Sequence, residues 1–429
     1  MNTILNLKRE ARFLAKQSSF WIPIGILFLL ATMTVWNGIA LVHSQTILIE
    51  QLIDKDKVDR NEALVKQTDY GSAAYYSFYF TYSSPTPLGF VTLGQRAIYP
   101  WKHRIRMLAL EGQIYESDTD NPELAFIGKF DFAFLVSVVL PLFVIVMLHD
   151  IQAREAKAGR FDLLQVSMHS THTVWLGRST VVILGIASAV VLPFVTGALV
   201  TQAPVLHAVI VILIILFHIL FWGFVTVKVG AIKPLISQGS ARIAALLLGI
   251  WVCLTLVVPA LGNTLIQRSV SGPSGGDIML TQREAVNDAW DLPFDATWGP
   301  FLNTHPQWQE YTEMSSLFEW KWYYAFQQVG DQKAAKLSNA YRQSLVKKDK
   351  YGGYVALLSP SLLTQRLLEK VSETDTKAML AYEDCVRHFH TRLRTFFYPL
   401  LFESPEYSTA SYDNLPLFSH TQCTHLGSK

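Results

Sequence analysis

Charged side chains are scarce in this sequence, and the charges that are present nearly cancel. Only 16% of the 429 residues are Asp, Glu, Lys or Arg, and the formal net charge at pH 7 is +2. A protein that binds nucleic acid usually carries a strongly basic patch, so we expect no nucleic-acid partner. Half of the residues are hydrophobic, and this excess indicates a chain with long buried or lipid-facing segments.

Short catalytic motifs are also missing. The chain has no Gly-x-x-x-x-Gly-Lys-[Ser/Thr] phosphate loop and no His-Glu-x-x-His metalloprotease motif. Two histidine pairs, His169/His172 and His388/His390, lack a carboxylate at ligand spacing, whereas zinc usually needs three or four converging ligands. We therefore expect no enzyme, no metal site and no cofactor in this chain.

Cysteine is rare, with 3 residues in the chain. Cys253 falls inside an apolar run and is expected to act as a small apolar filler. Cys385 and Cys423 both lie in the polar C-terminal segment. They could form a disulfide in an oxidising compartment, but the sequence cannot show that the two thiols lie close together, so free thiols are the favoured interpretation.

Five long apolar runs dominate what is present. A helix needs roughly 20 apolar residues to cross a bilayer, and each run meets or approaches that length. The pattern predicts an all-α integral membrane protein with about five to six transmembrane helices. The expected spans are residues 20–43, 130–149, 179–201, 205–227 and 243–266.

Basic residues predict the orientation of the chain. They gather in the N-terminal segment 1–19 and in the connections 150–178 and 228–242. Short connections rich in Lys and Arg stay in the cytoplasm, so segments 44–129 and 267–429 are expected outside. A cleaved signal peptide is the less favoured interpretation of the first run, because its apolar core is longer than such peptides need.

The two outer segments are too long to be simple loops. Their helical patterns predict a mostly helical extracytoplasmic domain formed by both insertions, with Ser361 as a helix cap after Pro360. We expect the aromatic run Tyr75–Tyr82 to pack beside the Trp320–Tyr324 cluster, because buried aromatics usually serve a core.

The connection 150–178 interleaves charged and apolar residues, which is typical of a short amphipathic helix at a membrane surface. Such a helix could dock a soluble partner or be a plain connector. Within the fourth span, His207 and His218 are candidate polar sites, although hydrogen bonding between helices would explain them equally well.

With this connection and several other stretches, over most of its length, the chain resembles the permease subunits of type-2 ABC exporters, and more narrowly the multi-copper-enzyme-maturation-type subgroup with large extracytoplasmic insertions. The matching stretches are Asp150…Arg154-Glu155…Gly159…Leu163-Leu164, Ser84-Pro85…Gly94-Gln95-Arg96…Pro100, Asn121-Pro122 through Phe134, Leu358-Ser359-Pro360-Ser361…Gln365, His388-Phe389-His390…Arg394…Phe397 and Leu415-Pro416.

The resemblance implies a transmembrane permease subunit in a bacterial inner membrane. Its residues Asp150, Arg154, Glu155, Gly159, Leu163 and Leu164 would couple to a separate ABC ATPase. The resemblance also implies a homodimer, or a heterodimer with a related permease, and ATP hydrolysis in the partner chain. Substrate and transport direction do not follow from the residues.

A sixth span, which such relatives carry near the C-terminus, has no counterpart here. The apolar stretch Leu393–Phe402 is too short and contains Pro399, so the C-terminus is expected outside. This departure keeps a second interpretation open, namely a membrane-anchored extracytoplasmic sensor or assembly factor without transport activity.

Overall fold

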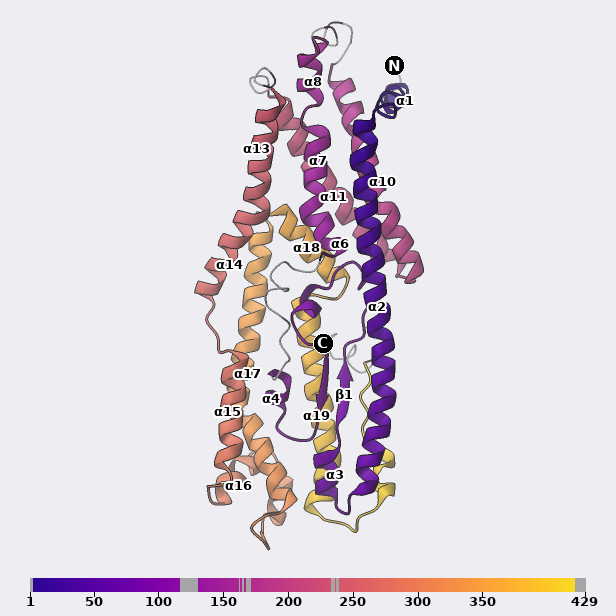
Figure 1. The fold of residues 1–429 in the computed structure, drawn as a ribbon. Helices are drawn as coiled ribbons and strands as arrows, with labels where there is room; N and C mark the ends of the chain where they lie inside the picture. Colours follow the sequence, from indigo (N-terminus) through magenta and orange to yellow (C-terminus); the bar gives the residue numbers. More distant parts are fainter. Residues whose placement is uncertain are drawn as a thin grey trace.

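The computed structural model describes residues 3–115, 130–161, 163, 166, 171–232, 236 and 239–420. The molecule is elongated, with a helix bundle at one end and a second helical body at the other (Figure 1). We call this second body the distal domain, formed by residues 44–115 and 267–420. The N-terminus lies at the far end of the bundle, beside α8 (Ile151–Lys157) (Figure 1).

Among the described residues, 5 helices are long and apolar enough to cross a membrane, and the bundle contains them. The prediction of an all-α membrane protein is therefore confirmed. The bundle elements are α1 (Thr3–Leu14), α2 (Ser18–Lys66), α6 (Phe132–Phe134), η2 (Leu135–Val139), α7 (Leu140–Leu148), α10 (Thr171–Val200), α11 (Val205–Gly230), α13 (Ser240–Val252), η3 (Cys253–Val257) and α14 (Val258–Ser269).

Helix α2 is much longer than the span predicted at 20–43. It has 49 residues and no break between its apolar half and its polar half, which corresponds to a rod of about 70 Å at ~1.5 Å per residue. Gly38 in its apolar half packs directly against the backbone of Phe90, where a side chain would clash. One rigid helix therefore serves both the bundle and the distal domain (Figure 1).

The distal domain is mostly helical, as predicted, and includes one small antiparallel sheet. The first segment supplies α3 (Tyr70–Tyr76), β1 (Tyr79–Tyr82), η1 (Gly94–Ala97), β2 (Lys102–Ile105) and α4 (Leu110–Tyr115). In the sheet, Tyr79 pairs with Ile105. The second segment supplies α15 (Gly275–Asp288), α16 (Asp295–Leu302), η4 (Pro306–Tyr311), α17 (Trp320–Ala356), α18 (Pro360–Val371), α19 (Thr376–Phe402) and η5 (Thr409–Asn414).

The two segments share one aromatic core, which confirms that they fold together. Tyr75 lies 5.9 Å from Trp320 and 6.0 Å from Tyr323, measured between ring centroids. The Tyr324 hydroxyl donates to the Gly71 carbonyl at 2.9 Å. Such rings bury large apolar areas and favour tilted or edge-to-face contacts, so each segment covers surface that the other would leave exposed.

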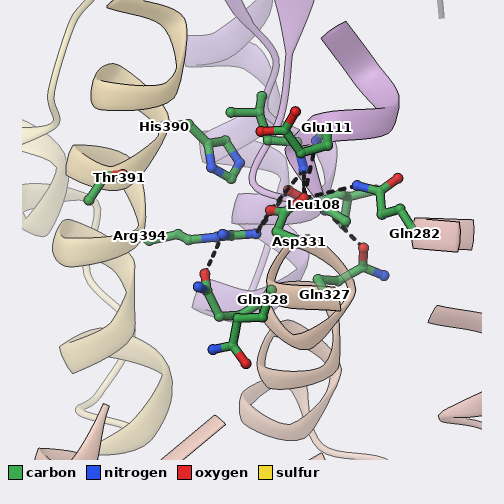
Figure 2. A network of polar contacts seen from close by, with 12 residues as sticks. Leu108, Glu111, Gln282, Gln327, Gln328, Asp331, His390, Thr391 and Arg394 are labelled. Atoms are coloured by element: carbon green, nitrogen blue, oxygen red, sulfur yellow. Dashed lines mark hydrogen bonds and ion pairs between the residues drawn. The ribbon is translucent and has the colours of Figure 1, made fainter. Parts of the chain in front are cut away.

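A partly buried carboxylate, Asp331 on α17, ties the segments together through polar contacts as well (Figure 2). Its oxygens accept from the backbone N–H of Leu110 at 2.8 Å, from Gln282 Nε2 at 3.0 Å and from Arg394 at 2.8 Å. The first contact satisfies an N–H at the start of α4, which would otherwise lack a partner. Helices α4, α15, α17 and α19 thus meet at one side chain.

The shared aromatic core predicts that Trp320→Ala will loosen both segments at once. A large-to-small change at a packed tryptophan typically costs ~3–5 kcal/mol, and Trp320 contacts Tyr75 and Tyr324 together. Limited proteolysis of the purified chain should show faster cleavage in both 44–115 and 267–420. Leu317→Ala is the control, because Leu317 is 88% exposed. Loosening of only one segment would contradict a shared core.

His103 on β2 predicts a pH dependence of stability. Burial lowers the pKa of His103 to about 4 from the usual 6.5. The unfolded chain therefore binds a proton between pH 6.5 and 4 that the folded chain does not, so stability falls as the pH falls through this window. The loss at pH 4 is about 3 kcal/mol at ~1.36 kcal/mol per pKa unit.

The measurement is the melting temperature as a function of pH, compared between the wild type and His103→Gln. The variant should lose less stability between pH 6.5 and 4. Groups with the opposite tendency, such as Glu383, whose pKa is raised by burial, are common to both chains and cancel in the comparison. Parallel pH curves for the two chains would show that His103 does not set the slope.

Candidate functional site

The connection predicted to be an amphipathic helix begins with α8 at the end of the bundle. Asp150 precedes the helix and pairs with Arg154 at 2.9 Å, one turn later. Gly159 ends it with a positive φ of 69°, a conformation that glycine adopts without strain and that commonly closes helices. The helix is thus held at a fixed position beyond α7.

Glu155, the central residue of the predicted coupling group, points inward. Its side chain is 5% exposed and accepts from Arg178 at 2.9 Å and from Arg160 at 2.7 Å. The Glu155 carboxylate is therefore paired inside the protein, and its role in coupling to an ATPase stays a prediction. Glu155 is buried because Arg178 on α10 supplies an opposite charge on the inner side of α8. This charge offsets the free-energy cost of removing the carboxylate from water.

Arg178 also contacts a second buried carboxylate, Glu10 on the N-terminal helix α1, at 3.0 Å. Its guanidinium lies over the rings of Phe13 and Trp175. One arginine therefore connects α1, α8 and α10. We call Glu10, Glu155 and Arg178 the arginine clamp. Sequence reasoning missed Glu10 and the role of Arg178, because their charges resemble the ordinary basic flank of a span.

Beside the clamp the surface carries uncovered apolar side chains. Leu163 is 69% exposed and Val166 is 89% exposed, while Leu164 lies outside the described residues. Arg154 is half exposed. A cavity of ≈ 70 Å³ is lined by Arg154 and by the clamp residues Glu155 and Arg178, together with Phe13 and Met147 among others. The connection after α8 therefore carries exposed apolar side chains.

The intramembrane candidate His218 takes part in a second site, formed with α18. Its Nδ1 lies 2.8 Å from the Thr364 hydroxyl. Two further contacts join α18 to the spans: Ser137 donates to Gln365 at 3.2 Å, and the hydroxyls of Thr255 and Ser361 lie 2.9 Å apart. We call Ser137, His218 and Thr255 the polar ring. Helix α18 lies midway along the molecule, at the base of the bundle (Figure 1).

Both hydroxyl residues of the polar ring lie in π-helical turns. These turns, η2 and η3, interrupt the second and fifth spans, and each is followed by a proline, Pro141 or Pro259. Proline has no N–H for the carbonyl four residues earlier, which here belongs to Ser137 or Thr255. The sequence signal that could have found them is a Ser/Thr-x-x-x-Pro repeat at 137–141 and 255–259.

Ser361 is therefore not the cap predicted from sequence. Ser359 caps α18, accepting from the Leu362 N–H at 3.2 Å, and Pro360 occupies the first helical position. Prolines favour that position because its N–H is not needed. The shift of two residues turns Ser361 inward, toward the fifth span.

The remaining candidates are dispersed. His207 is exposed near the start of α11. Among the described residues no three His, Cys, Asp or Glu side chains gather as metal ligands. His169 lies outside the described residues, and His390 is buried against the Arg106 carbonyl at 3.2 Å. Cys385 is buried and disulfide-bonded, but Cys423 lies outside the described residues, so their pairing stays a prediction.

Comparisons with known proteins match one part of the chain. Residues 278–421 match a family model described as a domain of unknown function, DUF3526. This range covers α18 and most of the second segment of the distal domain. No curated protein and no solved structure matches the chain.

The arginine clamp predicts a large difference between two Arg→Met changes. Arg178→Met leaves two buried carboxylates without their shared cation, which typically costs ~3–5 kcal/mol. Arg154→Met removes a half-exposed pair within α8, which is worth about 0.3–0.5 kcal/mol. Thermal unfolding in detergent, followed by tryptophan fluorescence, should show a clear fall in melting temperature for the first variant only. Equal shifts would mean that the clamp is not important for stability.

Proposed function

We propose that this chain is the transmembrane permease subunit of an ATP-driven ABC export system in a bacterial inner membrane. The observation that carries the proposal is the arginine clamp, which joins α1, α8 and the third span into one unit. A force applied to α8 from outside the bundle would therefore move a membrane helix. ATP hydrolysis would take place in a separate ATPase subunit.

Charge distribution supports placing this end of the bundle in the cytoplasm. Basic residues of α1 and α8, such as Arg12 and Lys157, lie at this end together with Lys228 and Arg242. Positive charges of short connections stay on the cytoplasmic side. The distal domain would then be extracytoplasmic, and the exposed Leu163 and Val166 would offer apolar contacts to the ATPase.

Packing inside the bundle favours an assembly of two permeases. The core at the level of the spans is closed by side chains such as Val144, Ile186, Ile215 and Trp222, each 0% exposed. A filled interior gives a single chain no open path at rest. A passage would therefore form between two copies of this chain, or between this chain and a related permease, and open when the ATPase subunits close.

A second candidate function, an extracytoplasmic sensor or assembly factor, is favoured by one feature of the distal domain. A cavity of ≈ 460 Å³ lies at the end of the domain farthest from the bundle, lined by Tyr70, Trp320, Lys321 and Tyr407 among others. Ligand pockets typically measure about 300–1,000 Å³ and combine aromatic walls with a few polar groups. In that case the spans would serve as an anchor only.

Co-purification distinguishes the two functions. If the chain is a permease, the tagged protein should retain a nucleotide-binding ATPase when isolated from its native membrane. Leu163→Glu should weaken this association by roughly tenfold or more, because burying one leucine is worth about 1.5–3 kcal/mol. Leu317→Glu, at an exposed leucine of the distal domain, is the matched control and should have no effect. Absence of any ATPase would favour the sensor.

A further inference from the structure

The polar ring is a level of buried polar side chains within the apolar bundle. Its three side chains come from three different spans and are all buried, with Ser137 and His218 each 1% exposed and Thr255 7% exposed. Their partners on α18 are Ser361, Thr364 and Gln365, which follow the i, i+3, i+4 spacing of one helix face. The spans therefore present a groove whose hydrogen-bonding groups match one side of a short helix.

Helix α18 occupies this groove without being a span itself. It has 12 residues, too few to cross a bilayer, and it belongs to the distal domain through Arg366, which pairs with Asp349 of α17 at 2.9 Å. Among the described residues, the three hydrogen bonds named above between α18 and the spans all join uncharged groups. Neutral hydrogen bonds are roughly half as strong as charge-assisted ones, and Leu368 adds an apolar contact with the bundle core, so no charged pair resists the release of α18 from the spans.

Hydrogen-bonding capacity is left over inside the groove. Among the described residues, Trp222 Nε1 and Thr226 Oγ1 have no hydrogen-bond partner, and they follow His218, whose ring contacts the backbone of Ser137. These residues are spaced by four and so share one face of α11. Buried polar atoms without partners are rare in native proteins and call for an explanation, such as a ligand or water. Here they form a line that leads from the polar ring toward the α8 end of the bundle.

We propose that the polar ring is the contact site for the transported molecule, and that α18 is its resident occupant at rest. The molecule is an uncharged amphiphile that carries hydroxyl or amide groups, the same groups that α18 presents. A charged group is disfavoured because the ring offers no opposite charge and burial of an unpaired charge is costly. The proposal rests on the permease function, whose own test is association with an ATPase.

A cross-linking experiment tests the site without any ATPase. The chain with Cys253→Ala, Thr255→Cys and Ser361→Cys keeps α18 in place, and its two new thiols should bond readily under mild oxidation because the native hydroxyls lie 2.9 Å apart. In nanodiscs, octyl glucoside should slow this cross-link by about tenfold, the change that one good hydrogen-bonding contact gives. Octyl sulfate and octyltrimethylammonium, with the same chain length, should not.

A second variant opens the groove instead. Ser361→Asp buries an unpaired charge against Thr255 and should release α18, so that a Ser137→Cys reporter in the Cys253→Ala background reacts faster with a membrane-impermeant maleimide. Leu367→Asp, on the outer side of the same helix at 37% exposure, is the matched control and should leave the reporter protected. Octyl glucoside should restore protection in the opened variant.

The outcomes separate the two proposals. Equal slowing by all three amphiphiles, or stronger slowing by a charged one, overturns the assignment of the polar ring and its ligand class. So does a reporter that is equally reactive with α18 docked and released. An ATPase that co-purifies with the chain while these tests fail leaves the permease function standing and removes only the contact site.

Discussion

The docking of α18 against the polar ring is the interaction on which the relation between the two ends of the molecule depends. Polar side chains inside an apolar bundle must find partners, since an unpaired buried group costs free energy. Ser137, His218 and Thr255 find theirs on a helix that belongs to the other body of the protein. The same contacts therefore satisfy the spans and fix the distal domain at the base of the bundle.

The rest of the architecture extends this junction in both directions. On the distal side, α17 leads directly into α18, and α17 carries Asp331, where α4, α15 and α19 converge (Figure 2). On the bundle side, α11 and the second and fifth spans lead away from the ring toward α8. The arginine clamp closes that far end by binding α1 and α8 to α10. A displacement at either end can reach the other through packed helices rather than through loops.

The π-helical turns η2 and η3 make two of the spans irregular at this junction. Each contains one residue more per turn than an α-helix requires, and each frees a carbonyl before a proline. Next to one of these carbonyls, Trp251 Nε1 donates to the Val138 carbonyl within η2 at 3.1 Å. The second and fifth spans thus each carry an irregular turn at the level where they contact α18.

Comparison of prediction and structure shows where sequence patterns are informative. The spans were predicted closely, for example 205–227 against the observed α11 at Val205–Gly230, because apolar length is a local property. The shared aromatic core of residues 75–82 and 320–324 was also predicted, since exposed aromatic runs need cover. The continuation of α2 to Lys66 was not predicted. The predicted span ended where the hydropathy falls, although the polar residues that follow carry no signal that ends a helix.

The sequence by itself determined the fold class, the number of apolar helices and the mostly helical distal domain, because hydropathy and periodicity act over neighbouring residues. Only the tertiary structure decided where individual polar groups point. Glu155 turned inward because Arg178, 23 residues later, approaches it from α10, and His218 acquired its partner from Thr364, 146 residues away. Pairing of buried polar groups depends on distances between helices, and the order of residues along one helix does not contain that information.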